Sequence, residues 1–543
     1  MGSNLLYKAS IITTPTAYGV GVLNSIKPAY ALGEELVTNG NFSNGTTSWT
    51  PNTNATLTIE DGRLKVAISG AGSGYPSQNI TTEVGKKYLI TANAYIGTAT
   101  KLSLYSPAIG FNDLTADGSY NLTFTATSTS TQIRLYVYGD GSYGFWDNVS
   151  VKKVTDADFD FTRTSSATRV NPDYLIETSA TNTPRLDYTN GTASILLEPA
   201  STNLLAYSED LTQGSVNRLL LTSNVDNAPD GTQSADKLIP NNTSSGYHYF
   251  AFSSLTIATN NVYSVFLKKA EYEYALISFE VNGISGSVDK ALINLNNGVI
   301  EQSDTETKVT DYGNGWYRCF IKATSSRTSV AIYPLPSASL SSFTGDNTSG
   351  IIAWGLQLEA LSFATSYIPT SGSAVTRAAE SLNNAGNSDL INSTEGVLYC
   401  EIAALAEENL SRYITISDGT STNRIIIYIT DVGVIKFFVG VGGVTQAAKT
   451  MTGQTTTNFN KLAISYKEND MKFYLNGAKV HTDTSALTFP VNTLNVVNFA
   501  ASNGTSNPFF GKCKMLAVFK ESLSDSELAC LTSTNNREIF LNY

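Results

Sequence analysis

The carboxylates of the chain show no spacing that predicts a catalytic pair. Hydrolysis of a glycosidic bond usually needs two carboxyl groups held at a fixed distance across a cleft. No hydrolase motif surrounds the candidates Glu401, Glu407, Glu408 and Asp418, and the adjacent Glu407 and Glu408 are typical of a solvated loop. We therefore expect no hydrolase, although a site assembled between subunits would leave no such motif and stays open as an alternative.

Nucleophilic catalysis is not indicated either. A serine nucleophile would need a G-x-S-x-G elbow and a histidine partner. The run GISGS at Gly283–Ser287 lacks the final glycine, and His248 and His481 stand in no matching context. The sequence also has no P-loop and no glycine run for a dinucleotide. We predict that the protein is not an enzyme.

The four cysteines indicate buried thiols rather than a metal site. Cys319, Cys400, Cys513 and Cys530 form no C-x-x-C pair, so a zinc knuckle is not expected. Cys319 and Cys400 stand in apolar runs, WYRCFI and VLYC, that predict strands. We expect free thiols inside the core.

The composition limits the partners. Lys and Arg total 35 against 46 Asp and Glu, which gives a net charge of −11. An acidic chain binds polyanions poorly, so neither nucleic acid nor anionic lipid is an expected partner. No run reaches the ~18 apolar residues of a membrane helix, and the start, MGSNLLYKAS, lacks a signal-peptide layout. We expect synthesis in a cytoplasm and no membrane insertion.

Short alternating runs separated by turn residues predict an all-β fold. Examples are RLKVAI and YNLTFTA, in which apolar and polar residues alternate. A chain of 543 residues is too long for one sandwich, so we expect several consecutive β-sandwich domains. The expected divisions are an N-terminal arm (1–33), a jelly roll (34–154), a strand-and-turn connector (155–194), a second jelly roll (195–378) and a last sandwich (379–543).

The N-terminal arm is apolar but shows no sustained period. Its first large apolar residues are Leu5, Leu6, Tyr7, Ile11 and Ile12, and prolines and glycines interrupt the runs that follow. An apolar segment that cannot fold alone usually becomes ordered on a partner. We therefore expect these five residues to anchor the protein on another one, with packing on its own first domain as the alternative.

The connector contains three arginines, Arg163, Arg169 and Arg185, in a chain that is otherwise short of charge. It contains the runs RTSSATRVN (163–171) and NTPRLDY (182–188), and the run ILLEPASTNLL (195–205) follows directly at the start of the second jelly roll. This order of runs resembles a motif of fibre and structural proteins of tailed bacteriophages, in which similar N-terminal arms also occur. The resemblance implies a virion part, whereas the residues alone are equally compatible with a structured connector that has no other role.

The first jelly roll opens with NGNF and Trp49 and closes with WDNVSV at Trp146. This resembles carbohydrate-binding modules of the family 4 and 9 type. The resemblance implies a structural Ca²⁺ held by Asp147, although Asn41 stands where those modules often have an acid. It also implies an aromatic sugar-binding face, for which Tyr75, Tyr136, Tyr138, Tyr143 and Trp146 are candidates. For Trp49 and Trp146 we favour a place in the core.

The last two sandwiches carry further resemblances. The second repeats the plan of the first, with Trp354 in its closing strand IIAWGLQLEAL. The third resembles laminin-G/concanavalin-A-like lectin sandwiches, which often bind sugars but also serve as spacers. Asn-Gly turns at Asn314 and Asn476 predict tight hairpins. Ser524 and Glu527 predict a capping box at the start of one short helix.

Together the resemblances imply a head or tail fibre or decoration protein on the virion surface, assembled in the host cytoplasm. The arm would bind capsid or tail proteins, and the lectin-like modules would bind host-surface glycans. A homo-oligomer is expected, with a trimer as one option, although no heptad or β-helix repeat enforces it. The alternatives are a purely structural spacer without glycan binding and, less favoured, a tail-spike depolymerase.

Overall fold

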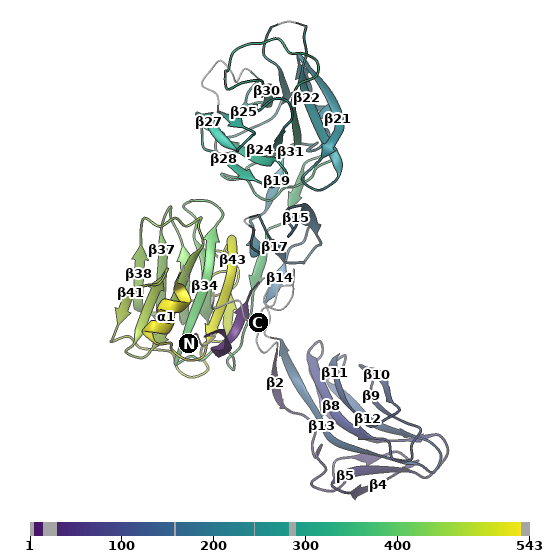
Figure 1. Cartoon of the computed structure of the whole chain (residues 1–543). Coiled ribbons are helices and arrows are strands. Elements are labelled where there is room, and N and C mark those ends of the chain that lie inside the picture. Colours follow the sequence, from purple (N-terminus) through teal and green to yellow (C-terminus); the bar gives the residue numbers. More distant parts are fainter. Residues whose placement is uncertain are drawn as a thin grey trace. The chain divides into compact units, whose positions relative to one another are not determined.

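The computed structural model describes residues 5–14, 30–156, 159–189, 191–243, 245–281 and 289–533. Strands dominate, and the described part has one α-helix, α1 (Asp525–Thr532) (Figure 1). The prediction of an all-β protein with several sandwiches is confirmed. The chain divides into a small unit, Lys27–Asp158, and a large unit made of Met1–Ile26 and Phe159–Tyr543. No described helix has the length and apolarity needed to cross a membrane.

The small unit is a sandwich of two antiparallel sheets. One sheet has the order β10-β9-β12-β7-β3, with strands Gly110–Leu114, Lys101–Ser106, Ser130–Tyr138, Pro76–Thr81 and Thr50–Pro51, and β6 (Ser73–Gly74) also pairs with β12. The other has the order β11-β8-β13-β5-β4, with strands Gly118–Thr125, Lys87–Tyr95, Tyr143–Asp156, Arg63–Ile68 and Ala55–Glu60, and β2 (Tyr30–Glu35) also pairs with β13. Trp49 and Trp146 are buried in its core, which confirms the place predicted for them.

The second sandwich belongs to the large unit and also has two six-stranded sheets. One has the order β20-β23-β30-β25-β26-β27, with strands Ser215–Asn217, Tyr249–Phe252, Val330–Leu335, Tyr274–Phe279, Lys290–Asn294 and Val299–Ser303. The other has the order β21-β22-β31-β24-β29-β28, with strands Leu219–Asn227, Gln233–Pro240, Ile351–Glu359, Val262–Lys269, Trp316–Lys322 and Thr307–Asp311. Asn314 and Gly315, both at positive φ, form the predicted tight turn between β28 and β29.

The C-terminal sandwich packs an eight-stranded sheet on a five-stranded one. The larger sheet has the order β17-β18-β43-β34-β39-β40-β41, with strands Arg185–Asp187, Ser194–Leu197, Gly511–Phe519, Glu395–Ala404, Asn460–Lys467, Met471–Leu475 and Ala478–Asp483, and its eighth strand, β1 (Ala9–Thr13), also pairs with β43. The smaller has the order β38-β37-β36-β35-β42, with strands Val444–Met451, Ile435–Val441, Arg424–Ile429, Arg412–Ser417 and Val496–Asn498. The Asn476-Gly477 turn and the capping box at Ser524 form as predicted.

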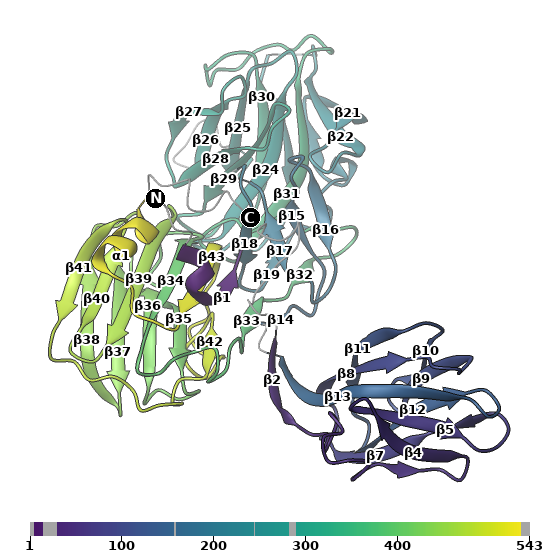
Figure 2. The ribbon, with the colours of Figure 1, turned by 60° about the horizontal axis from the view of Figure 1, so that its bottom comes forward.

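The first residues of the N-terminal arm pack on the C-terminal sandwich of the same chain. Residues Leu5–Lys8 form the 3-10 helix η1, and β1 (Ala9–Thr13) pairs antiparallel with β43 (Figure 2). Leu5, Leu6, Ile11 and Ile12 are at most 4% exposed, whereas Tyr7 is 67% exposed. The expectation that the four aliphatic side chains need a second protein is therefore wrong, because the chain's own last sandwich buries them. Residues 15–29 of the arm lie outside the described part.

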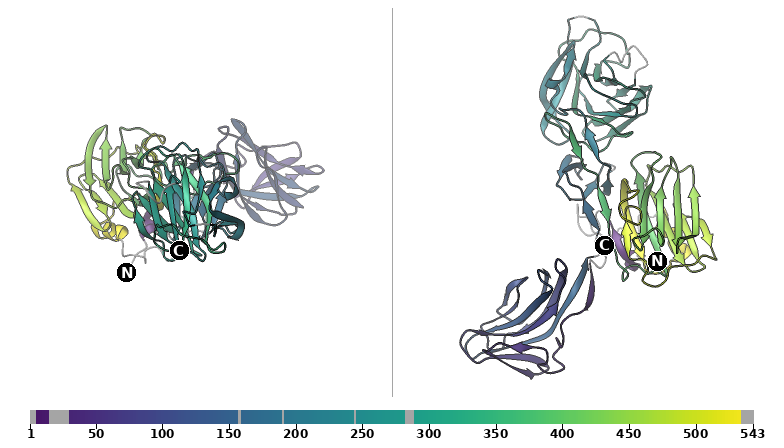
Figure 3. Two further views of the ribbon diagram at one scale, coloured as in Figure 1. Left: turned by 90° about the horizontal axis from the view of Figure 1, so that it is seen from above. Right: turned by 180° about the vertical axis from the view of Figure 1, so that it is seen from behind.

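The connector is built from short strand pairs that tie distant segments together. Strand β14 (Asp160–Thr162) pairs with β33 (Ser381–Asn383), and β19 (Ser201–Asn203) pairs with β32 (Val375–Arg377). Strands β15 (Ala167–Val170) and β16 (Ile176–Ser179) form a hairpin. Because β17 and β18 extend the sheet of the C-terminal sandwich next to β43 (Figure 2), the connector is continuous with that sandwich, and Figure 3 shows the same ribbon from two further sides.

Candidate functional site

Aromatic side chains gather on the outer face of the sheet that contains β12 in the small unit. Antiparallel pairing places Arg134 opposite Tyr105, and Tyr105 opposite Phe111. Residues that face each other across neighbouring strands point to the same side of a sheet. The period of two along β12 then adds Tyr136 and Tyr138 to this side. We call the tyrosine face the set formed by Tyr75, Tyr105, Phe111, Tyr136 and Tyr138.

The rings of the tyrosine face contact one another. Tyr75 and Tyr136 have ring centroids 4.4 Å apart, and Tyr105 and Phe111 have centroids 4.5 Å apart. Tyr136 also stacks on Tyr138 at 5.8 Å. Phe111 is 56% exposed, whereas Tyr136 is nearly buried beneath its neighbours. The arrangement is a continuous aromatic surface with Tyr136 at its centre.

Charged groups lie among these rings. The guanidinium of Arg134 is 5.0 Å from the Tyr75 centroid and 5.2 Å from that of Tyr105. The Lys101 ammonium is 4.5 Å from the Tyr138 centroid and pairs with Asp113 at 2.7 Å. That hydrogen bond from Lys101 lowers the pKa of Asp113, so the carboxylate is ionised at neutral pH. Apolar ring surface therefore alternates with hydrogen-bonding groups, which is the composition that orients a polar ligand in a binding site.

Three of the four predicted tyrosines lie together on this face, and Tyr143 does not. Tyr143 stands on β13 in the opposite sheet, where its ring is 5.5 Å from that of Phe145 and 4.2 Å from the Lys65 ammonium. Tyr105, Phe111 and Arg134 were missed. The alternation of KLSLYS and TQIRLYVY could have indicated Tyr105 and Arg134, because both share the parity of the tyrosine face.

Asp147 has local partners within β13. Its carboxylate accepts hydrogen bonds from the backbone N–H of Asn148 at 2.8 Å and from the Asn148 side chain at 3.0 Å. Across the described residues, no group of three or more His, Cys, Asp or Glu side chains could hold a metal ion. The side chains therefore do not form a preorganised calcium site around Asp147, and a calcium ion there would depend on backbone and amide oxygens.

The C-terminal sandwich has a relationship that sequence comparison detects. Residues 404–529 match the concanavalin A-like lectin/glucanases superfamily. This agrees with the lectin-like sandwich expected from the order of its strands. No curated protein matches the chain.

Several solved structures are similar to parts of the chain. The CBM40 of Ruminococcus gnavus IT-sialidase, bound to α2,3-sialyllactose, is 19% identical, with 26% of this chain and 83% of that one covered and a TM-score of 0.23. A CBM4 structure is 16% identical, covering 22% and 99%, with a TM-score of 0.19. The tandem CBM22 domains of Paenibacillus barcinonensis Xyn10C are 12% identical, covering 60% and 98%, with a TM-score of 0.20.

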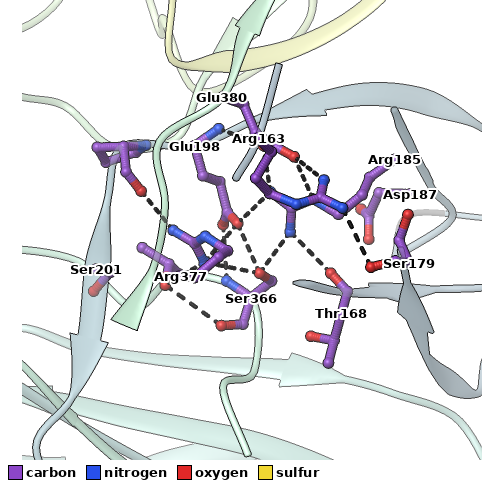
Figure 4. Close-up of polar contacts among 12 residues, drawn as sticks. Arg163, Thr168, Ser179, Arg185, Asp187, Glu198, Ser201, Ser366, Arg377 and Glu380 are labelled. Atoms are coloured by element: carbon purple, nitrogen blue, oxygen red, sulfur yellow. Dashed lines mark hydrogen bonds and ion pairs between the residues drawn. The ribbon is translucent and has the colours of Figure 1, made fainter. Parts of the chain in front are cut away.

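A second polar centre lies within the large unit, where the connector meets the end of the second sandwich. We call the arginine–glutamate cluster the set of Arg163, Arg185, Arg377, Glu198 and Glu380 (Figure 4). All five residues are at most 3% exposed. Glu380 pairs with Arg163 at 2.7 Å and with Arg185 at 2.5 Å. Glu198 pairs with Arg185 at 2.8 Å and with Arg377 at 2.9 Å. Each carboxylate thus bridges two arginines.

The cluster holds the Glu198 carboxylate in the ionised form. Burial by itself would raise the pKa of Glu198, but Arg377 and Arg185 lower it to about 2. Burial disfavours the charged form of Arg185 as well, yet Glu198 and Glu380 raise its pKa above the usual value. A carboxylate occupied by two guanidinium groups has no proton to donate and no free lone pair for a substrate. The geometry therefore supports a structural role for these two glutamates.

The other acidic candidates are also engaged by the protein. Glu407 accepts hydrogen bonds from Thr456 and from the backbone N–H of Gly433, and Glu408 pairs with Arg412 at 2.9 Å. Glu407 and Glu408 lie in a loop, as predicted, but this loop is not fully solvated, since both residues are half-buried. Asp418 accepts from Thr420 and Asn423. The Gly283–Ser287 run lies outside the described residues.

Three of the cysteines behave as predicted. Cys319, Cys400 and Cys513 are free and buried, whereas Cys530 is half-buried. Burial raises the pKa of the Cys319 thiol far above its usual value, so it is neutral at physiological pH. Nucleophilic or metal-binding chemistry needs the thiolate form, so Cys319 is a packing residue.

Proposed function

We propose that the protein is a structural component of a tailed-bacteriophage virion, a fibre or decoration protein of the head or tail, that adheres to host-surface glycans. The tyrosine face is the observation that carries the adhesion. Sugars present apolar C–H faces that stack on aromatic rings and hydroxyl groups that need hydrogen-bond partners. The rings of Tyr105 and Phe111 offer a stacking surface for the C–H faces. Arg134, Lys101 and Asp113 offer hydrogen-bond partners for the hydroxyl groups.

The place on a virion is supported by the sequence of the connector. The runs at 163–171, 182–188 and 195–205 resemble those of phage fibre and structural proteins. Two of their arginines, Arg163 and Arg185, belong to the arginine–glutamate cluster. The motif would then supply the buried ion pairs that hold the connector between one sandwich and the next. A homo-oligomer on the virion surface is part of the proposal.

We further propose that the protein binds without catalysis. The buried glutamates of the cluster are neutralised by arginines, and Glu407, Glu408 and Asp418 have partners within the protein. A tail-spike depolymerase would need two carboxylates free to reach one glycosidic bond. Release of reducing ends from host polysaccharide by the purified protein would contradict this part of the proposal.

A glycan array with the full chain tests the adhesion. We expect binding to host-surface glycans that falls at least tenfold in the double variant Tyr105→Ala/Phe111→Ala, because both rings are accessible. A matched control is Tyr143→Ala, which removes a tyrosine from the opposite sheet. Equal binding by the wild type and the double variant would overturn the proposed site. Absence of any array signal would favour a purely structural spacer. Mass spectrometry of purified virions tests the location.

A further inference from the structure

A pocket of about 480 Å³ lies within the large unit, between the second sandwich, the connector and the C-terminal sandwich. This volume is within the range of pockets that bind small molecules, about 300–1,000 Å³. One wall comes from β28 and β29, another from β17 and β43, and a third from residues 403–407 with Thr457 and Phe459. The pocket is separate from the tyrosine face, which belongs to the small unit.

The wall from β28 and β29 combines positive charge with an aromatic ring. In the register of these strands, Lys308 faces Phe320 and Thr310 faces Arg318. The four side chains therefore form a compact square on one side of the sheet, and all four line the pocket. The wall offers two cations, a hydroxyl and an apolar ring at one place.

The carboxylates that line the pocket are already paired. Glu198 is held by Arg185 and Arg377, Asp187 pairs with Lys512 at 2.8 Å, and Glu306 pairs with Lys322 at 3.0 Å. Glu407 accepts from backbone N–H groups and Thr456. Within the described part of the chain, none of these carboxylates is left to neutralise Lys308 or Arg318.

Arg318 and Lys308 therefore lack acidic partners among the described residues. Arg318 is 8% exposed, donates to the Thr365 carbonyl at 2.6 Å and to the Ser264 hydroxyl at 3.1 Å, and its buried Nε has no partner among the described residues. Lys308 forms no ion pair in the described part of the chain, and its side chain is accessible in the pocket. Surrounding protein lowers the pKa of Lys308, and the charges of Lys512 and Arg318 lower it further. Because Arg318 is a buried charge without an acidic partner, which is costly, an anion that entered here beside it would be stabilised.

We propose that this pocket binds a short saccharide that carries a carboxylate. The carboxylate would pair with Lys308 and Arg318, a sugar ring would stack on Phe320 or Phe459, and Thr310 and Thr457 would meet hydroxyl groups. The inference extends the proposed adhesion to a second site in the other unit. Its failure and the failure of the tyrosine face are distinguishable because the two sites share no residue.

Isothermal titration of the full chain with digalacturonate and with neutral galactobiose tests the pocket. We expect digalacturonate to bind at least tenfold more tightly than galactobiose, and Lys308→Gln to lower that affinity at least tenfold. Lys308 is accessible, so this variant should fold normally. Lys449→Gln is the matched control, because Lys449 lies on β38 away from the pocket. The variant Tyr105→Ala/Phe111→Ala should retain full digalacturonate affinity.

Three results would overturn the proposal. The first is no preference for the acidic disaccharide, and the second is unchanged affinity in Lys308→Gln. The third is that Tyr105→Ala/Phe111→Ala loses digalacturonate binding while Lys308→Gln keeps it. This result would assign the acidic sugar to the tyrosine face. Competition by inorganic sulfate as strong as that by digalacturonate would contradict recognition of the sugar ring.

Discussion

The arginine–glutamate cluster and the tyrosine face both involve charged side chains, but these side chains have different surroundings in the two regions. In the cluster, three arginines and two glutamates are buried and bridge one another, so they contribute to how segments of the chain meet. On the tyrosine face, Arg134 and Lys101 lie against aromatic rings at the surface, where a ligand can reach them. The comparison teaches that charges paired inside the protein hold segments of the chain together, whereas accessible charges beside exposed rings are the ones we propose for binding.

Removal of one bridging carboxylate should give the largest effect. Glu380→Ala leaves Arg163 and Arg185 buried with less compensation, and breaking such a pair costs about 3–5 kcal/mol of unfolding free energy. We expect the large unit to unfold at a much lower denaturant concentration, while the small unit unfolds at the wild-type concentration. Hydrogen exchange with mass spectrometry at increasing denaturant concentration measures the two units separately. Glu273→Gln, which removes an exposed partner of Lys269, is the control and should leave both units unchanged. Equal exchange in wild type and Glu380→Ala would contradict the structural role.

The N-terminal strand should come next. Ile12 is 2% exposed in the core of the C-terminal sandwich. Its truncation to alanine should lower the unfolding free energy of that sandwich by about 2–5 kcal/mol, the usual cost of removing a buried aliphatic side chain. The exposed neighbour Tyr7 is the control, and Tyr7→Ala should cost clearly less. A wild-type denaturation midpoint in Ile12→Ala would mean that β1 does not dock in solution.

Acid should lower the stability of the large unit, which contains the arginine–glutamate cluster. Glu198 has a pKa of about 2 in the folded chain, against its usual 4.5. A lowered carboxylate pKa stabilises the fold fully above pH 4.5, and this stabilisation is lost as the pH falls from 4.5 towards 2. We expect the large unit to lose stability across this window, and Glu198→Gln to have a lower but flatter profile. Denaturant midpoints between pH 2 and 7 would measure it, and parallel profiles for the two proteins would contradict the assignment.

Calcium should have the smallest effect. A structural ion at Asp147 would make the melting temperature of the small unit sensitive to a chelator. Because Asn148 already occupies the Asp147 carboxylate, we expect excess chelator to lower that temperature by no more than about 1 °C, below the shift of about 2–4 °C that 1 kcal/mol produces even in a larger domain of 150–250 residues. Asp147→Asn is the matched variant. A large shift in the wild type that the variant lacks would establish a calcium site that the side chains alone do not reveal.

Local patterns in the sequence were sufficient for the strands, the Asn-Gly turns and the capping box at Ser524, since each depends on residues close in sequence. They were also sufficient for Tyr136 and Tyr138, which alternate within one strand. Tyr143 was grouped wrongly because alternation does not tell which sheet a strand joins. The sequence singles out the arginines of the connector, but their partner Glu380 lies 217 residues from Arg163. Patterns of neighbouring residues cannot predict a contact over that separation.

Pairing of β1 with β43 joins two strands that lie about 500 residues apart in the sequence, with partners such as Ile12 and Ala517. During synthesis at about 5–20 residues per second, the ribosome would need roughly 25–100 s to make the strand that receives β1. For that time the apolar first strand has no native surface to cover it, while the earlier sandwiches can already fold. The C-terminal sandwich can therefore close only after β43 has been made, and until then we expect nascent chains of this protein to need a chaperone that covers β1.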